Sequence, residues 1–272
     1  MTSSSNKYLS DADNVLSNKF VRDGYIINPV EDLHQLDNIR EFVEELGRDH
    51  LGKESLKGET DFFNSTHQYL AVKELNELRL SVINGLRAAD WFKPAYYALA
   101  REAIHAIIGN ELAMQRGINL SIQLPNDDSS LLPIHADVLN GDSCFEVVLW
   151  VPLVDCYRTK SMYILSPERT SAIFDDFKKY DGQTTDVIFE TIKPHIEWLE
   201  VPYGSYLLFS QNLLHGNLVN EEPETRWSMN CRFKSLLSPY ADKKFGEFFE
   251  PITMRAATRI GLKFKEPSLD DG

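Results

Sequence analysis

Two different spacings of hydrophobic residues divide the chain near residue 112. Before this point, apolar residues recur every three or four positions in residues 29–50, 71–92 and 93–112. This spacing gives each segment one apolar face and predicts amphipathic helices. Pro29 and Pro94 lie at the start of the first and third segments, where a helix does not need the missing N–H. We therefore expect residues 1–111 to be mainly helical.

After residue 112 the apolar runs become short and rich in β-branched and aromatic residues. They predict strands at residues 117–125, 144–155, 161–166, 195–202, 204–210 and 226–237. One helix is expected at residues 166–180, with Ser166 as its N-cap and Pro167 after it. Six or more antiparallel strands must cover their edges, and a jelly-roll barrel does so.

These patterns predict an α+β fold with a single domain over residues 1–272. Residues 112–236 form the jelly-roll core in this interpretation, and the helices of residues 1–111 pack against it as support. Residues 237–272 form a C-terminal extension.

Composition limits the location and the partners of the chain. Its 28 basic and 41 acidic residues give a net charge of −13, which disfavours binding to nucleic acid. The three cysteines, Cys144, Cys156 and Cys231, form no CxxC pair and suggest reduced thiols. The first residues do not resemble a signal peptide, and no run of 18 apolar residues predicts a membrane span. We expect a cytoplasmic protein with a flexible N-terminus.

The stretch LLPIHADVLNG, residues 131–141, places His135 two residues before Asp137. In an extended segment, positions two apart point to the same side, so an imidazole nitrogen and a carboxylate oxygen would face one point. Two histidines and one carboxylate are the ligands of many non-haem Fe(II) oxygenases. This interpretation requires a second histidine farther along the chain.

His215 is the best candidate for that second histidine. It follows an apolar strand and precedes Gly216, so it lies at a strand end, where a barrel opens. In a barrel, strands distant in sequence become neighbours, which brings His215 within reach of His135. We interpret the other five histidines as surface or structural residues: His34, His50, His67, His105 and His195.

The strand at residues 226–237 alternates between two kinds of side chain. Arg226, Ser228, Asn230 and Arg232 share one face, and apolar residues occupy the other. The polar face is either the solvent side of a sheet or the lining of a barrel that holds an anion. A guanidinium binds a carboxylate through two parallel hydrogen bonds, and a serine hydroxyl can add a third.

Together, His135-x-Asp137, His215 and Arg226-x-Ser228 match the HxD…H…RxS pattern of Fe(II)/2-oxoglutarate-dependent oxygenases. The chain resembles this family, and most closely its phytanoyl-CoA hydroxylase-like branch and the oxygenases of bacterial sporadic carbohydrate-biosynthesis clusters. The resemblance covers residues 112–236. Residues 164–170, ILSPERT, depart from the proline–glycine–serine–histidine turn of many relatives, so substrate contacts from that loop are not carried over.

The resemblance implies a double-stranded β-helix, or cupin-like, core in which His135, Asp137 and His215 hold catalytic Fe(II). It also implies 2-oxoglutarate as cosubstrate and O2 as oxidant. The reaction would hydroxylate a small molecule, such as a carbohydrate or a carbohydrate-linked intermediate, and release succinate and CO2. Asp137 favours hydroxylation or a related oxidation, because halogenase relatives carry a small residue at this position.

The same resemblance implies that Arg226 and Ser228 bind the far carboxylate of 2-oxoglutarate. Gln123 is a third candidate for cofactor binding, because it shares a strand face with Asn119 and Ser121. Arg232, six residues after Arg226 on the same face, is the alternative arginine.

Two other functions stay open from the sequence. A cupin-like metal-dependent isomerase would need the histidines but not Arg226-x-Ser228, and a non-catalytic binding barrel would need neither. Trp150 and Trp227 could stack on a sugar, although Trp227 opposes the arginine face and is expected in the core. A small-molecule substrate is the expected partner, and a homodimer is left open.

Overall fold

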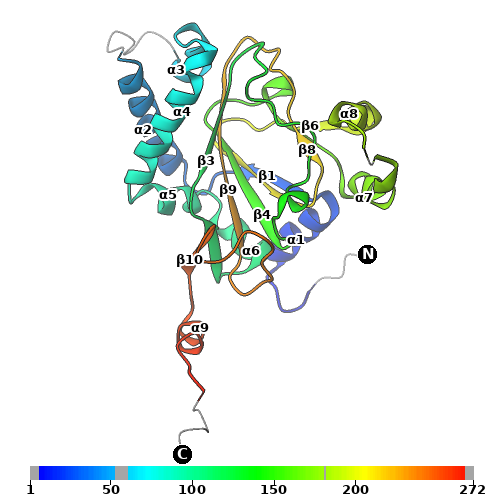
Figure 1. Ribbon diagram of the computed structural model, residues 1–272. Helices are drawn as coiled ribbons and strands as arrows, with labels where there is room; N and C mark the ends of the chain where they lie inside the picture. The colour runs from blue at the N-terminus through cyan, green and yellow to red at the C-terminus, as the bar shows by residue number, and fades with distance from the viewer. Residues whose placement is uncertain (1–5, 53–60, 181, 267–272) are drawn as a thin grey trace, which may run out of the picture.

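A computed structural model describes residues 6–52, 61–180 and 182–266. Two antiparallel sheets lie at its centre, with most of the helices against the larger sheet (Figure 1). The larger sheet has seven strands and the smaller sheet has three. The predicted combination of N-terminal helices and a mainly antiparallel β-region is confirmed.

The larger sheet has the strand order β1-β7-β4-β9-β2-β10, and β3 pairs with β9 beside β2. Strand β9 is the longest, because its alternating sequence suits a sheet with one apolar face and one polar face. Two strands, β2 and β3, share one edge of β9, while β4 occupies the other edge. The bounds are β2 Leu112–Gln115, β3 Asn119–Gln123, β4 Glu146–Pro152, β7 Ser205–Ser210 and β9 Arg226–Ser235.

Two strands of the larger sheet lie outside residues 112–236. Strand β1, Tyr25–Pro29, precedes the long helix and pairs with β7, and strand β10, Phe249–Thr253, pairs with β2. They form the two ends of the strand order. The sequence analysis identified neither strand, because YIINP and FEPIT are short and each contains a proline.

Capping residues and local backbone conformation set the ends of the helices. The segment at residues 29–50 forms α2 only from Leu33, because Asp32 accepts the capping hydrogen bond from Gln35. The segment at residues 93–112, predicted as one helix, forms two helices, with a non-helical backbone at Ala100 (φ −147°, ψ 29°) between them. The helix bounds in this half are α1 Asp11–Asp23, α2 Leu33–Leu51, α3 Phe62–Ser65, α4 Leu75–Ala88, α5 Phe92–Ala98 and α6 Arg101–Ile108.

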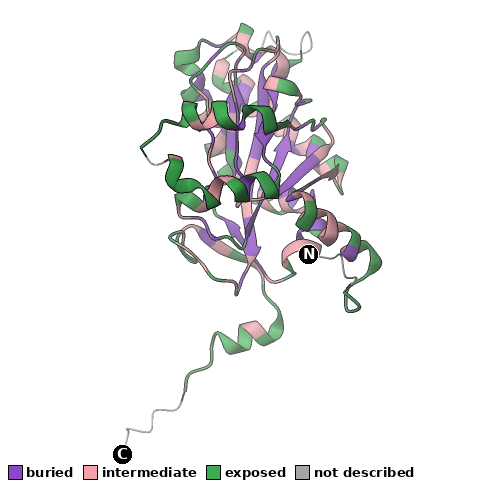
Figure 2. Ribbon diagram, turned by 90° about the vertical axis from the view of Figure 1, so that its right-hand side faces the viewer, coloured by how far each residue is buried: buried purple, intermediate pink, exposed green. Residues whose placement is uncertain are grey.

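One hydrophobic core joins the N-terminal helices to the larger sheet (Figure 2). Trp227 is fully buried and packs against Phe62 and Phe63, as expected for a core residue. In addition, the Tyr96 hydroxyl of α5 donates to the Leu149 carbonyl of β4 at 2.8 Å. The helices thus cover the apolar face of the sheet and leave its polar face free to form a site.

The smaller sheet has the order β6-β5-β8 and supports a second, smaller core with α7 and α8. Ser166 caps α7 by accepting from the N–H of Arg169, as predicted. Helix α8 was not predicted. The bounds are β5 Tyr163–Ile164, α7 Pro167–Asp175, α8 Thr185–Ile192, β6 Glu197–Trp198 and β8 His215–Gly216.

The chain continues beyond β10 into a short helix, α9, Ala256–Gly261, which points away from the body (Figure 1). None of the helices in the described part of the chain has the length and apolar character needed to span a membrane. The three cysteines are free thiols, of which Cys156 and Cys231 are buried.

Candidate metal and anion site

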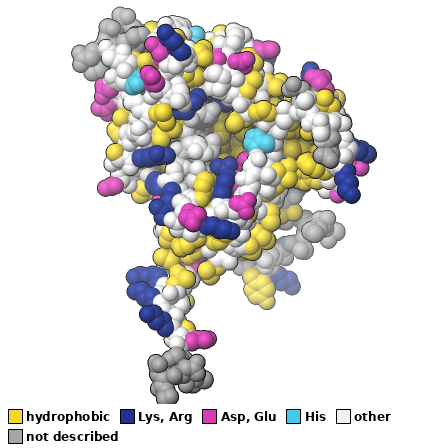
Figure 3. Space-filling model, in the orientation of Figure 1, with side chains coloured by type: hydrophobic (Ala, Val, Ile, Leu, Met, Phe, Trp, Pro, Cys, Tyr) yellow, Lys and Arg dark blue, Asp and Glu magenta, His cyan; other side chains and the backbone are white. Residues whose placement is uncertain are grey.

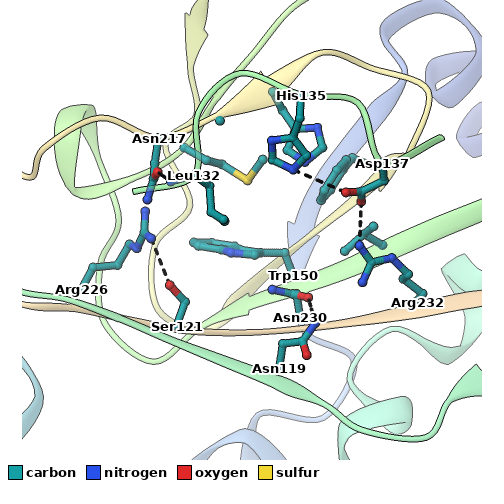
Figure 4. Close-up of a pocket in the computed structure, with 15 residues that line it drawn as sticks. Asn119, Ser121, Leu132, His135, Asp137, Trp150, Asn217, Arg226, Asn230 and Arg232 are labelled. Carbon is teal, nitrogen blue, oxygen red and sulfur yellow. Dashed lines mark hydrogen bonds and ion pairs between the residues drawn. The ribbon is translucent and has the colours of Figure 1, made fainter. Parts of the chain in front are cut away.

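His135, Asp137 and His215 come together at one end of the cavity between the two sheets (Figure 4). One potential ligand atom from each residue lies within 4.8 Å of the others. The backbones of His135 and His215 form two hydrogen bonds with each other, of 3.0 and 2.9 Å. The short distance between the two imidazole rings therefore depends on backbone pairing as well as on side-chain rotamers. Ala136 is extended, with φ −120°, while Asp137 opens a short 3-10 turn. The two-residue spacing therefore places both side chains on one side, although His135 forms only an isolated β-bridge with His215 and not a strand.

Both histidines present the same ring nitrogen to the centre. The Nδ1 atom of His135 lies 2.7 Å from the Pro133 carbonyl, and the Nδ1 atom of His215 lies 2.9 Å from the Leu213 carbonyl. A carbonyl only accepts, so each Nδ1 carries a hydrogen and the neutral ring has its lone pair on Nε2. This is how proteins orient histidine ligands of metals.

The Asp137 carboxylate would repel the Nε2 lone pair of a neutral His135 if no cation lay between them. The Nε2 atom of His135 lies 3.4 Å from Oδ1 of Asp137. With Nδ1 protonated, a lone pair would face an anion unless a proton or a metal cation lies between the two atoms. The donor set of two imidazole nitrogens and one carboxylate oxygen suits Fe(II) and similar divalent ions. The residues present therefore fit a metal ion.

The electrostatics of the group follow from its burial and its partners. Burial lowers the pKa of His215 to about 4, and the neighbouring His135 adds to this effect. Burial also acts to lower the pKa of His135, but its hydrogen bonds to Asp137 and Pro133 outweigh it and raise that pKa. Burial opposes ionisation of Asp137, yet the hydrogen bond from His135 and nearby positive charge hold its pKa well below the usual range. Asp137 is therefore an anion at neutral pH.

Arg232 holds the other oxygen of this carboxylate. Its Nη2 lies 3.1 Å from Oδ2 of Asp137, and its Nε lies 3.2 Å from Oδ1 of Asp142. The Nε also donates to Gln211 at 3.1 Å. Lys243 forms a second ion pair with Asp142. Arg232 is thus engaged by two carboxylates, which leaves Arg226 as the arginine available for an added anion.

Arg226 is 3% exposed and has no carboxylate within ion-pair distance among the described residues. Its Nη1 donates to the Ser161 carbonyl and its Nη2 to the Ser121 hydroxyl, each at 3.1 Å. Burial lowers the pKa of Arg226. A guanidinium keeps its charge at neutral pH, so this is a buried cation that lacks an anionic partner.

Several buried polar atoms of Arg226 and its neighbours have no hydrogen-bond partner among the described residues. They are Oε1 of Gln123, Oγ of Ser161, Nε of Arg226 and Oγ of Ser228. The strand register places Gln123 opposite Arg226 and Ser121 opposite Ser228. Unpaired buried groups are rare in proteins, and this group includes the Nε of the guanidinium and two hydroxyl donors beside it. The arrangement fits an anion with several acceptor oxygens.

His135, Asp137 and His215, which we call the metal group, line the same cavity of about 240 Å3 as Arg226. It opens as a hollow beside an exposed histidine in Figure 3. Ser228 and Gln123 are fully buried but are not among its lining residues within the described chain. Arg232 also lines the cavity, and the remaining lining side chains combine amides, hydroxyls and apolar groups: Asn119, Ser121, Leu132, Val148, Trp150, Met162, Phe209, Asn217 and Asn230.

Some residues of the site could not be recognised in the sequence. Asn217 binds the backbone N–H of Leu132 through its Oδ1 and so ties the loop before His135 to β8. Gly216 permits this contact, because an added Cβ would lie 2.9 Å from the Leu132 carbonyl oxygen and 2.6 Å from the Tyr163 hydroxyl. The only sequence signal for this close approach was the glycine directly after His215.

Comparison with known proteins supports the fold. No protein-family model and no curated protein matches this sequence. Among solved structures, a non-heme monooxygenase, ThoJ, in a nickel complex has 16% identity and a TM-score of 0.53, covering 88% of this chain and 84% of its own. EctD from S. alaskensis, with 2-oxoglutarate and 5-hydroxyectoine, has 15% identity and a TM-score of 0.51, covering 88% and 81%.

A third similar structure is HygX from Streptomyces hygroscopicus with nickel and 2-oxoglutarate bound. It has 12% identity and a TM-score of 0.51, and the match covers 87% of this chain and 90% of HygX. At these identities the likeness shows a shared fold.

Proposed function

We propose that this protein is an Fe(II)- and 2-oxoglutarate-dependent dioxygenase that hydroxylates a small molecule. One observation carries the proposal: a single cavity contains a group that could hold a metal ion and a buried arginine that has no acidic partner among the described residues. A metal ion alone would not require Arg226. A cosubstrate with a chelating end and a distant carboxylate would use both features.

In this proposal His135, Asp137 and His215 hold the iron. The two Nδ1 hydrogen bonds fix the rings, and Arg232 fixes the carboxylate, so the protein presents its ligands in place. Three protein ligands leave coordination positions open for the cosubstrate and O2. When bound, iron supplies the oxidative chemistry, in which 2-oxoglutarate yields succinate and CO2.

Arg226 binds the far carboxylate of 2-oxoglutarate in this proposal. Its fork geometry suits two parallel hydrogen bonds, and the unpaired Oγ of Ser228 supplies a further donor. The unpaired oxygen of Gln123 is an acceptor, so it cannot bind a carboxylate directly, and the Nε2 of Gln123 already donates to the Leu218 carbonyl at 2.6 Å. HygX and EctD, which share the fold, have been solved with 2-oxoglutarate bound.

We assign the chain to the phytanoyl-CoA hydroxylase-like branch, with a double-stranded β-helix core. The support is the order His135-x-Asp137, His215, Arg226-x-Ser228 and the two facing sheets. We also propose that the protein works in the cytoplasm, in keeping with its free cysteines.

A carbohydrate or a carbohydrate-linked intermediate is the proposed substrate. The amides of Asn119, Asn217 and Asn230 and the hydroxyl of Ser121 offer donors and acceptors to a molecule rich in hydroxyl groups. Trp150 lies across the cavity floor with 6% exposure and offers an aromatic face beside them (Figure 4). Apolar lining such as Met162 and Phe209 excludes water near the metal group.

The test is succinate formation from 2-oxoglutarate by anaerobically purified protein, assayed with Fe(II), ascorbate and O2. We expect succinate in the complete mixture and none when Fe(II) is omitted or replaced by Zn(II). An Arg226→Gln variant should fail at the same 2-oxoglutarate concentration. Turnover that does not depend on 2-oxoglutarate would overturn the proposal and favour a different metal-dependent reaction.

A further inference from the structure

The residues after β10 form an arm that the other described residues leave exposed. We define the C-terminal arm as residues 254–266, which contain α9. Every residue of the arm except Thr258 is exposed (Figure 2). The exposed side chains include apolar residues: Met254, Ile260, Leu262 and Phe264, of which Ile260 and Phe264 are 72% and 70% exposed.

The contacts between the arm and the other described residues are too few to explain the helix of the arm. Glu111 accepts from the N–H of Arg255 at 2.8 Å and from the side chain of Thr258, and both contacts are at the surface. Helix α9 has six residues, whereas isolated helices shorter than about 12–15 residues are marginal in water. An ordered arm of this length therefore needs a surface to pack against.

The charge of the arm indicates the nature of that surface. The arm carries four basic residues, Arg255, Arg259, Lys263 and Lys265, and one acidic residue, Glu266. Residues 267–272 hold two further acids, so residues 1–253 hold 24 of the 28 basic and 38 of the 41 acidic side chains, a net charge of −14. Figure 3 shows the basic side chains gathered on the arm, below the body.

We propose that the arm binds the acidic body of a second copy of this chain, so that two arms are exchanged in a two-fold symmetric dimer. The apolar side chains of each arm are covered by the partner copy, and its positive charge meets a body of opposite sign. In a dimer with a two-fold axis, each arm contacts the body of the other copy in the same way, so the apolar side chains of both arms are covered. The inference is independent of the proposed reaction, because no arm residue lines the cavity.

Light scattering coupled to size-exclusion chromatography tests the dimer. We expect the full chain to have twice the mass of a single chain, and a chain ending at Thr253 to be monomeric. The double variant Ile260→Asp/Phe264→Asp should also be monomeric, as should Arg259→Glu/Lys263→Glu. Leu237, which is 68% exposed outside the arm, supplies the matched control, and Leu237→Asp should remain dimeric.

Added salt should shift the full chain toward monomer, because exposed charges are screened within a Debye length. Circular dichroism melts check that each variant is folded. A full chain that is monomeric at all accessible protein concentrations would overturn the proposal, as would a folded truncated chain that is still dimeric. Binding of the monomeric full chain to anionic phospholipid vesicles, lost on truncation, would also overturn it and assign the arm to a membrane surface.

Discussion

Arg232 and Asp137 form an ion pair beside the metal group, with Nη2 of Arg232 3.1 Å from Oδ2 of Asp137. Because Oδ2 is engaged, Oδ1 is the oxygen that faces His135, at 3.4 Å from its Nε2. The pair joins β9 to the loop that carries the first histidine. Strand β9 supplies both arginines of the cavity, and their partners differ: Arg232 pairs with carboxylates, whereas Arg226 donates to a carbonyl and a hydroxyl.

Replacing Arg232 by Gln should weaken metal binding. The substitution removes the charge that orients Asp137 and leaves Asp142 with Lys243 as its remaining cation. Loss of a partner that orients a metal ligand typically costs roughly tenfold to a hundredfold in metal affinity. Anaerobic calorimetric titration with Mn(II) measures the change. Unaltered Mn(II) affinity in a folded variant would show that Arg232 does not position the carboxylate.

His135→Ala and His215→Ala should each lose metal binding. Each histidine supplies one of three protein ligands, so the loss should exceed the roughly hundredfold effect of removing an orienting partner. His34, which is exposed and outside the cavity, provides the control variant His34→Ala. The same Mn(II) titration applies, with circular dichroism to confirm folding. If either site variant binds Mn(II) as the control does, that histidine is not a ligand.

Glu146 should make the protein less stable as the pH rises toward neutral. Burial, with the nearby Asp142 charge, raises the pKa of Glu146 to about 7, against hydrogen bonds from Ser143 and Gln211. The unfolded value is roughly 4.3. Between these values the folded state binds more protons than the unfolded state, so the free energy of unfolding falls as pH increases.

Urea unfolding of the wild type and Glu146→Gln, at several pH values from 4.5 to 7, isolates this contribution. The difference between the two proteins removes the effect of other titrating groups. We expect the wild type to lose more stability than the variant across this window. Parallel curves would mean that Glu146 titrates alike in the folded and unfolded states.

Arg226→Lys should raise the KM for 2-oxoglutarate and leave Mn(II) affinity unchanged. Lysine keeps the charge but lacks the planar fork, so one good charge-assisted hydrogen bond is lost, at about 1.5–3 kcal/mol. This corresponds to roughly tenfold to a hundredfold in affinity. Arg232→Lys is the matched variant from the same strand. A rise in KM confined to the Arg232 variant would exchange the roles of the two arginines.

Local sequence patterns predicted much of the fold and the grouping of His135, Asp137 and His215. The alternation in residues 226–237 gave the two faces of β9, and the HxD spacing placed two side chains together. The sequence could not show that Arg232 pairs with Asp137, because that contact joins segments almost a hundred residues apart and depends on strand register. Strands β1 and β10 were missed because each depends on a distant partner strand rather than on a strong pattern of its own.

Binding of 2-oxoglutarate to the Mn(II)-loaded protein without O2 tests the central claim most directly. Calorimetry should show one 2-oxoglutarate per chain in the wild type, with binding lost in His215→Ala. In Arg226→Gln we expect at least roughly tenfold weaker binding, since the buried carboxylate loses its charged partner. Absence of binding to the metal-loaded wild type would contradict the account, as would equal affinity in the Arg226→Gln variant.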